Sequence, residues 1–118
     1  MQSSRCMLDG LTNSIERYMD LLSARQRVVA SNIANADTPG YHTQDIDFQA
    51  ELQSQMAGAR PNTLEVSHLP SKNDGNNVDL DREARLLAEN ALRFNLASNL
   101  VRSHIRIVKE AIQEGKNS

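Results

Sequence analysis

At residues 30–41 the chain reads Ala30-Ser31-Asn32-Ile33-Ala34-Asn35-Ala36-Asp37-Thr38-Pro39-Gly40-Tyr41, where a helical pattern meets a sharp turn. Before the turn, apolar residues recur at steps of three, four or seven, so they share one face of a helix expected from about Leu8 to Ala36. Proline moves Thr38 out of the α region, and Gly40 permits the positive φ of a turn. The pattern therefore predicts a long helix that ends at a tight corner. Its apolar positions are Leu8, Leu11, Ile15, Met19, Leu22, Val29, Ile33 and Ala36.

The end of this helix combines three chemical features. Asn32 and Asn35 can donate and accept hydrogen bonds where the close approach of a neighbour would otherwise leave polar groups unpaired. Tyr41 follows the turn with an apolar ring and a hydroxyl group. A solitary helical hairpin requires none of these three features, so the stretch indicates contacts with other helices. The small side chains that allow close approach are those of Ala30, Ala34 and Ala36.

The C-terminal part of the chain predicts a second long helix. Apolar and small residues alternate there at steps of four and three, which is the heptad pattern of a helix packed along a partner helix. Asp79 or Asp81 is expected to cap its start and Gly115 to end it. The seam consists of Leu80, Ala84, Leu87, Ala91, Phe94, Ser98, Val101, Ile105, Val108 and Ile112. A second set lies off this seam, beyond what one buried face needs: Leu86, Leu92, Leu96, Leu100 and Ile107.

The middle of the chain is polar and rich in turn signals. Phe48, Leu52 and Met56 indicate a short helix capped by Asp45 or Asp47, and only residues 63–66 alternate like a strand. The sequence thus divides into four parts. Residues 1–7 are an N-terminal tail, expected to be a start-site extension, and residues 8–41 hold the first helix and its corner. Residues 42–78 hold a short helix and a polar loop, and residues 79–118 the heptad helix.

Helix length predicts the shape of the molecule. A helix over residues 8–36 is about 43 Å long and one over residues 79–112 about 51 Å. A compact chain of 118 residues has a diameter of roughly 35 Å. We therefore expect a mainly α, elongated, coiled-coil-like hairpin of two long terminal helices, whose core is completed by other chains.

Composition and spacing argue against several functions. The net charge of -2 and the spread of the ten arginines along the chain disfavour a nucleic-acid partner. The single cysteine, Cys6, is expected in a mobile tail before the first helix, where a catalytic role is improbable. His42, His68 and His104 lack metal-ligand spacing and are expected to be solvated or loop residues. No cofactor, metal or catalytic residues are predicted, so the chain is not expected to be an enzyme.

The sequence also argues against a membrane span. The longest stretch without Asp, Glu, Lys or Arg is residues 28–36, whereas a spanning helix needs about 20 apolar residues. Asp9 and Glu16 interrupt the place where the apolar region of a signal peptide would lie.

The corner resembles the bacterial flagellar rod and hook family of axial proteins. The family signature is a small residue, then Asn-x-x-Asn-x-x-Thr-Pro-Gly-Tyr, here residues 31–41. Within the family the match is closest to the proximal rod proteins, through residues 35–41, 45–52 and 75–83. The resemblance implies two sets of assembly residues. The first is the motif Asn32, Ile33, Ala34, Asn35, Thr38, Pro39, Gly40 and Tyr41, and the second is the helix-packing seam Leu80, Leu87, Phe94, Val101, Ile105, Val108 and Ile112.

The resemblance further implies a structural subunit of the rod of the flagellar basal body, which transmits torque and lines the export channel. Its implied partners are other copies of itself, a FliE-like adaptor, other rod proteins that are FlgC-, FlgF- or FlgG-like, and the flagellar export gate. It implies a place in the periplasm, reached by flagellar type III export without a cleaved signal. The alternatives are another small rod protein, FlgC-like, or a cytosolic helical adaptor or chaperone.

Overall fold

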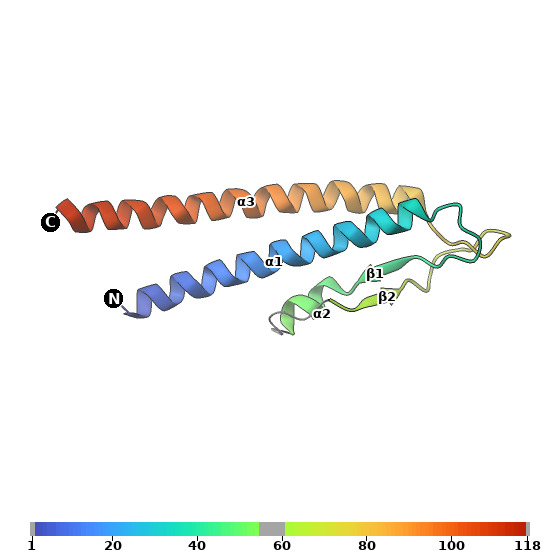
Figure 1. The fold of residues 1–118 in the computed structure, drawn as a ribbon, viewed down its shortest axis with the longest axis horizontal. Coiled ribbons are helices and arrows are strands. Elements are labelled where there is room, and N and C mark those ends of the chain that lie inside the picture. The colour runs from blue at the N-terminus through green and yellow to red at the C-terminus, as the bar shows by residue number, and fades with distance from the viewer. Residues whose placement is uncertain (1, 55–60, 118) are drawn as a thin grey trace.

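Two long antiparallel helices dominate the computed structural model, which describes residues 2–54 and 61–117 and the side chains of residues 10–54 and 61–116. The elements in chain order are α1 (Gln2–Ala34), β1 (Gln44–Ile46), α2 (Phe48–Gln53), β2 (Thr63–Glu65) and α3 (Leu80–Asn117). The molecule measures 72 × 25 × 18 Å. In Figure 1, α1 and α3 run side by side, with both termini at one end and the corner at the other. The predicted elongated, mainly α hairpin is confirmed.

The first helix begins earlier than expected. α1 starts at Gln2 rather than Leu8, so Cys6 lies within the helix and not in a tail before it. It ends at Ala34, because the backbone N–H of Asn35 is shared between the carbonyl oxygens of Ser31 and Asn32 as the chain enters the corner.

The second long helix starts as predicted and ends later. The Asp79 carboxylate accepts hydrogen bonds from the backbone N–H groups of Asp81 and Arg82, so Asp79 is the N-cap. The expected stop at Gly115 is wrong, because α3 continues to Asn117. A glycine ends a helix efficiently when it adopts a positive φ, and Gly115 is not among the glycines that do.

The middle segment folds back along α1. Asp47, not Asp45, caps α2 by accepting a hydrogen bond from Ala50 N–H; Met56, expected on this helix, lies outside the described residues. The predicted strand is β2, and it pairs antiparallel with β1, which the sequence did not predict. The register sets Asp45 opposite Leu64.

The face of α3 that packs against α1 differs from the predicted seam. Glu83, Leu86, Asn90 and Ala97 are buried, at spacings of three, four and seven residues. Two of them are polar, so an apolar pattern cannot identify this face. Most seam residues are instead exposed, namely Leu80, Leu87, Phe94, Ile105 and Ile112, while Val101 and Val108 are half-buried.

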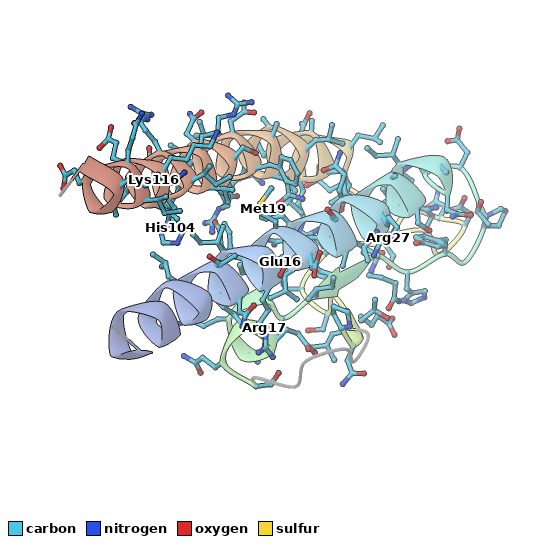
Figure 2. The ribbon with its side chains drawn as sticks, turned by 60° about the vertical axis from the view of Figure 1, so that its left-hand side comes forward. Glu16, Arg17, Met19, Arg27, His104 and Lys116 are labelled. Carbon is cyan, nitrogen blue, oxygen red and sulfur yellow. The ribbon has the colours of Figure 1, made fainter. Side chains whose placement is uncertain are left out.

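Farther from the corner, half-buried side chains fill the space between α1 and α3. Figure 2 shows Met19 of α1 and His104 of α3 between the two ribbons, and Lys116 near the free end of α3. His104 is therefore neither a loop residue nor fully solvated, unlike the exposed His42 and His68. Among the described side chains, the buried apolar residues are Ile15, Leu21, Leu22, Ala24, Val29, Ile46, Val78, Leu86 and Ala97.

Candidate functional site: the corner junction

The corner opens with the turn that the sequence predicts. The backbone N–H of Tyr41 donates to the carbonyl oxygen of Thr38 at 3.2 Å, and Gly40 has a φ of 75°. Pro39 and Gly40 therefore occupy the second and third positions of a type II turn, where a glycine is favoured because a Cβ is strained at positive φ.

A second glycine turn packs against the first. Gly75 has a φ of 84°, and a Cβ built on it would lie 3.5 Å from the Cα of Gly40. The backbone N–H of Gly40 donates to the carbonyl oxygen of Asp74 at 2.9 Å. The two turns, far apart in sequence, thus form one compact end of the molecule.

Asn76 and Asn77 tie the second turn to α1 and β1. The Asn76 side chain is fully buried, and its Nδ2 donates to the carbonyl oxygens of Asn35 and Thr38 at 2.9 and 2.8 Å. These bonds satisfy carbonyl groups at the end of α1. Asn77 Oδ1 accepts from the backbone N–H of Thr43 at 2.6 Å. The site prediction did not include these two residues; their only signal was their place in the loop cluster and in the family match at residues 75–83.

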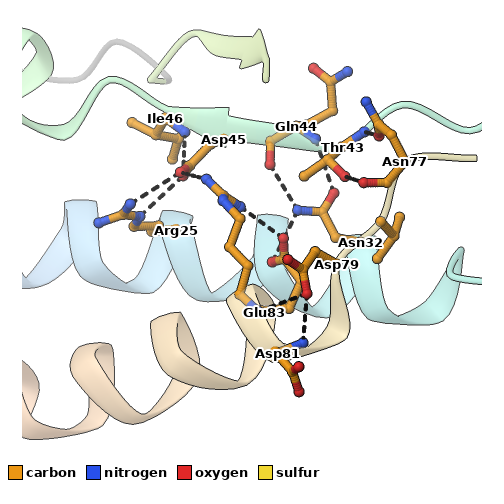
Figure 3. Close-up of polar contacts among 12 residues, drawn as sticks. Arg25, Asn32, Thr43, Gln44, Asp45, Ile46, Asn77, Asp79, Asp81 and Glu83 are labelled. Atoms are coloured by element: carbon orange, nitrogen blue, oxygen red, sulfur yellow. Dashed lines mark hydrogen bonds and ion pairs between the residues drawn. The ribbon is translucent and has the colours of Figure 1, made fainter. Parts of the chain in front are cut away.

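Asn32 is the hub of the junction (Figure 3). Its side chain is fully buried. Nδ2 donates to the carbonyl oxygen of Gln44 at 2.8 Å and to Glu83 Oε2 at 3.2 Å. Oδ1 accepts from Tyr41 Oη at 2.8 Å and from the backbone N–H of Gln44 at 3.1 Å. Both donors and both acceptor positions of the amide are used, so one side chain joins α1, β1 and α3.

Four charged side chains surround the hub. Asp45 binds Arg25 through two hydrogen bonds of 3.1 and 3.0 Å, and its Oδ2 also accepts from Arg82 at 2.7 Å. Arg82 in turn binds the fully buried Glu83 at 2.8 Å. Burial by itself raises the pKa of Asp45, but hydrogen bonds from Arg25, the Ile46 N–H and Arg82, together with the charge of Arg25, hold that pKa below its ordinary value of 3.8.

The predicted assembly motif therefore divides into two parts. Asn32 and Tyr41 point into the junction, where Asn32 binds Glu83 of α3 as well as Tyr41. Asn35 folds its amide back onto its own helix, where Nδ2 donates to the carbonyl oxygen of Ser31 at 2.8 Å. The residues of the motif that are exposed are Ile33, Ala34, Thr38, Pro39 and Gly40.

The described residues offer little for other chemistry. Among the side chains of residues 10–54 and 61–116, no three of His, Cys, Asp or Glu are grouped so as to hold a metal ion. No helix in this part of the chain has the length of apolar sequence needed to cross a bilayer. The two acidic residues Asp45 and Asp47 serve separate purposes: Asp45 binds two arginines and Asp47 caps α2.

Comparisons with known proteins identify the family. The pattern described as "Flagella basal body rod protein" matches residues 19–42, which span the second half of α1 and the corner turn. The chain is 33% identical to the flagellar basal body rod protein FlgB of Escherichia coli, over 92% of this chain and 99% of that protein. It is 32% identical to FlgB of Yersinia ruckeri over 92% of this chain and 97% of that protein. It is 35% identical to FlgB of Borrelia hermsii over 82% of this chain and 91% of that protein.

These matches confirm the resemblance and disfavour both the FlgC-like and the cytosolic adaptor alternatives. Because the relatives are structural rod proteins, they also confirm that the chain is not an enzyme. The chain belongs to the FlgB family of flagellar basal body rod proteins, as a structural subunit of the rod.

Proposed function

We propose that this rod subunit uses its corner junction to fix the two long helices relative to each other, while the exposed apolar faces of those helices pack against neighbouring subunits. In this arrangement the subunit transmits motor torque and contributes to the wall of the export channel. The observation that carries the proposal is the amount of apolar side chain that α3 leaves uncovered. The exposed set on α3 is Leu80, Leu87, Leu92, Phe94, Leu96, Leu100, Ile105, Ile107 and Ile112.

The exposed set is too large and too ordered to be incidental. Leu92, Leu96 and Ile107 are 61%, 61% and 59% exposed. Full burial of such a side chain stabilises an assembly by about 1.5–3 kcal/mol, before the costs of association are subtracted. Contiguous apolar patches on a protein surface mark interaction sites. The heptad spacing of these residues favours helices of neighbouring subunits as the surfaces that bury them.

Torque transmission requires that the hairpin does not shear. The bonds from Asn32 to Gln44 and Glu83, and those from Asp45 to Arg25 and Arg82, connect α1, β1 and α3 at several points. Directional polar contacts specify one relative position of the helices more strictly than apolar contacts do. This supports a role for the junction as the rigid end of a subunit under load.

The proposed partners follow from the family. They are other FlgB subunits, a FliE-like adaptor, FlgC-, FlgF- and FlgG-like rod proteins, and the flagellar export gate. We place the subunit in the periplasm, at the base of the rod, and propose that it leaves the cytosol through the flagellar export apparatus without a cleaved signal.

The experiment is complementation of a strain that lacks its own FlgB. The intact chain should restore basal bodies and swimming. The double variant Leu92→Ser, Leu96→Ser should be present at a normal cellular level, because both side chains are exposed in the free subunit, yet should yield few basal bodies. Asp20→Ala, an exposed change on α1, serves as the control. Normal basal bodies with the double variant would reject the proposal that these faces are covered by neighbours.

A further inference from the structure

One buried polar atom between α1 and α3 has no hydrogen-bond partner. The side chain of Asn90 is almost fully buried, with 3% of the residue exposed. Its Nδ2 donates to Gln26 Oε1 at 3.3 Å. Its Oδ1 has no partner among the described residues. Because buried polar groups in native proteins are nearly always satisfied, an orphaned amide oxygen calls for an explanation.

Asn90 lies on the wall of a groove of about 400 Å³ between α1 and α3. We call this the Asn90 groove; Leu22 of α1 and Leu87, Ala91 and Phe94 of α3 also line it. Leu87 and Phe94 are 37% and 40% exposed, and the small residue Ala91 lies between them in the sequence and lines the same groove. Apolar walls with one unsatisfied acceptor fit a helix edge that carries large apolar side chains and one hydrogen-bond donor.

A helix edge of that kind lies on the opposite flank of α3. The leucine row consists of Leu92, Leu96 and Leu100, which are 61%, 61% and 51% exposed. Leu96 follows Phe94 by two residues, so the two side chains point about 200° apart around the helix axis. The row is about 12 Å long, and the groove from Leu87 to Phe94 about 10 Å, at about 1.5 Å per residue. Asn99, which is exposed, borders the row.

We propose that the Asn90 groove of each subunit receives the leucine row of a second copy of this chain, and that Asn99 of that copy donates its amide N–H to Asn90 Oδ1. The proposal rests on the proposed function as a self-assembling rod subunit and specifies the contact that this function uses. The terminal amide torsion of asparagine is soft, so Oδ1 can turn toward the groove.

This contact is heterologous, because the groove and the row are different surfaces on opposite flanks of one helix. A subunit that has used its groove still presents its row, so the contact propagates from copy to copy and does not close into a two-fold dimer. The contact thus covers the exposed apolar residues of α3 that line the groove and those that form the row.

Cysteine cross-linking tests the geometry. In a Cys6→Ser background, Ala91→Cys labels the groove and Leu96→Cys labels the row. The double variant, oxidised in isolated basal bodies and as purified protein at high concentration, should give dimers, trimers and longer products, whereas each single variant should remain monomeric. Strong dimers from either single variant, or no products from the double variant, would overturn the heterologous contact.

Replacing Asn90 separates the proposed contact from a role within the subunit. Asn90→Leu removes the orphaned oxygen and leaves the exposed Gln26 to water, so it should not lower the thermal unfolding midpoint of the free subunit. It should lower the cross-linking yield about fivefold, the effect of one hydrogen bond. Asn99→Ala should lower the yield equally, and the pair of changes no further than either alone. A lower unfolding midpoint with an unchanged yield would assign Asn90 to the α1–α3 contact only.

The two proposals fail in different ways. If the intact chain fails to restore basal bodies although the protein is present, the proposed function is rejected, and cross-linking of the purified protein still tests the contact. If basal bodies form and the double cysteine variant gives no ladder, only the packing inference fails.

Discussion

The corner and the free end of the hairpin are stabilised by different interactions. At the corner, the buried polar side chains of Asn32, Asn76 and Glu83 all find partners within the chain. Toward the free end, Leu100, Ile107 and Ile112 are each more than half exposed. The corner is therefore complete in one subunit, while the shaft leaves apolar side chains that, in our proposal, other copies cover. This division matches a subunit whose geometry must be set before it is packed into a larger structure.

The polar character of the corner has an energetic consequence. Buried ion pairs such as Arg82–Glu83 contribute less net stability than apolar packing, because both charges lose their hydration. They are costly to break, however, since the remaining partner stays buried and unpaired. The junction should therefore respond sharply to single substitutions, whereas the shaft should respond mainly in assembly.

The largest effect is expected at Asn32. Asn32→Leu removes the hydrogen-bond partner of the Gln44 N–H, of the Tyr41 hydroxyl and of Glu83 Oε2. At about 1–3 kcal/mol for each stranded group, the free energy of unfolding should fall by about 3 kcal/mol or more. Denaturant titration of the purified protein measures this loss.

Asn35→Leu is the matched control, since the Asn35 amide is half-buried and binds only Ser31 and Thr38 nearby. We expect a loss of about 1 kcal/mol or less, with any larger defect appearing in the number of basal bodies. Equal losses of stability from the two variants would break the distinction between a corner fixed within the chain and surfaces used in assembly.

A smaller loss is expected at the two turns. Gly40→Val and Gly75→Val place a β-branched residue at positive φ, at about 1–3 kcal/mol each. Gly75→Val should be the worse of the two, because a Cβ at Gly75 would already touch Gly40, which leaves less room for the two valine methyl groups than the open space at Gly40 does. Cellular protein and completed basal bodies, counted separately, tell folding from assembly. Wild-type levels of both would show that neither turn needs glycine.

Acid should weaken the corner before it weakens the shaft. The pKa of Asp45 lies below its ordinary value of 3.8 in the folded chain. Its contribution to stability is therefore fully present above that ordinary value, and is lost as the pH falls through the lowered pKa. Asp45→Asn should remove this part of the pH dependence of unfolding. A variant that loses stability in acid as steeply as the parent would exclude Asp45 as the source.

The smallest effect is expected at the N-terminus. Cys6→Ser, or removal of residues 1–6, should leave swimming unchanged, because these residues lie outside the family match and before the apolar pattern that begins at Leu8. Swimming assays at matched protein levels check this. A clear defect would show that the first turns of α1, which begins at Gln2, belong to the working shaft.

Local sequence patterns predicted the elements that depend on local rules. The two long helices, the turn at Thr38–Tyr41, the Asp79 cap and the strand at residues 63–65 all follow from periodicity, capping or glycine and proline chemistry. The family resemblance added the rod function. The helix end at Gly115 was wrong because glycine is compatible with a helix interior as well as with its end.

The junction was harder to predict because its partners are distant in sequence. Asn32 and Glu83 are 51 residues apart, and Arg82 and Asp45 are 37 apart. No periodic pattern records such pairings. The α1-facing side of α3 was missed for a related reason: its buried residues include Glu83 and Asn90, which binary apolar patterning assigns to the surface.

Hydrogen exchange on the free subunit tests the central claim most directly. We predict slow exchange at the backbone N–H groups of Thr43, Gln44 and Val78, which donate inside the corner, and fast exchange in α3 beyond Leu100 when the free subunit is dilute. In assembled basal bodies both regions should be protected. Strong protection along the whole of α1 and α3 in a monomer whose exchange does not change with concentration would contradict the claim that other copies complete the shaft.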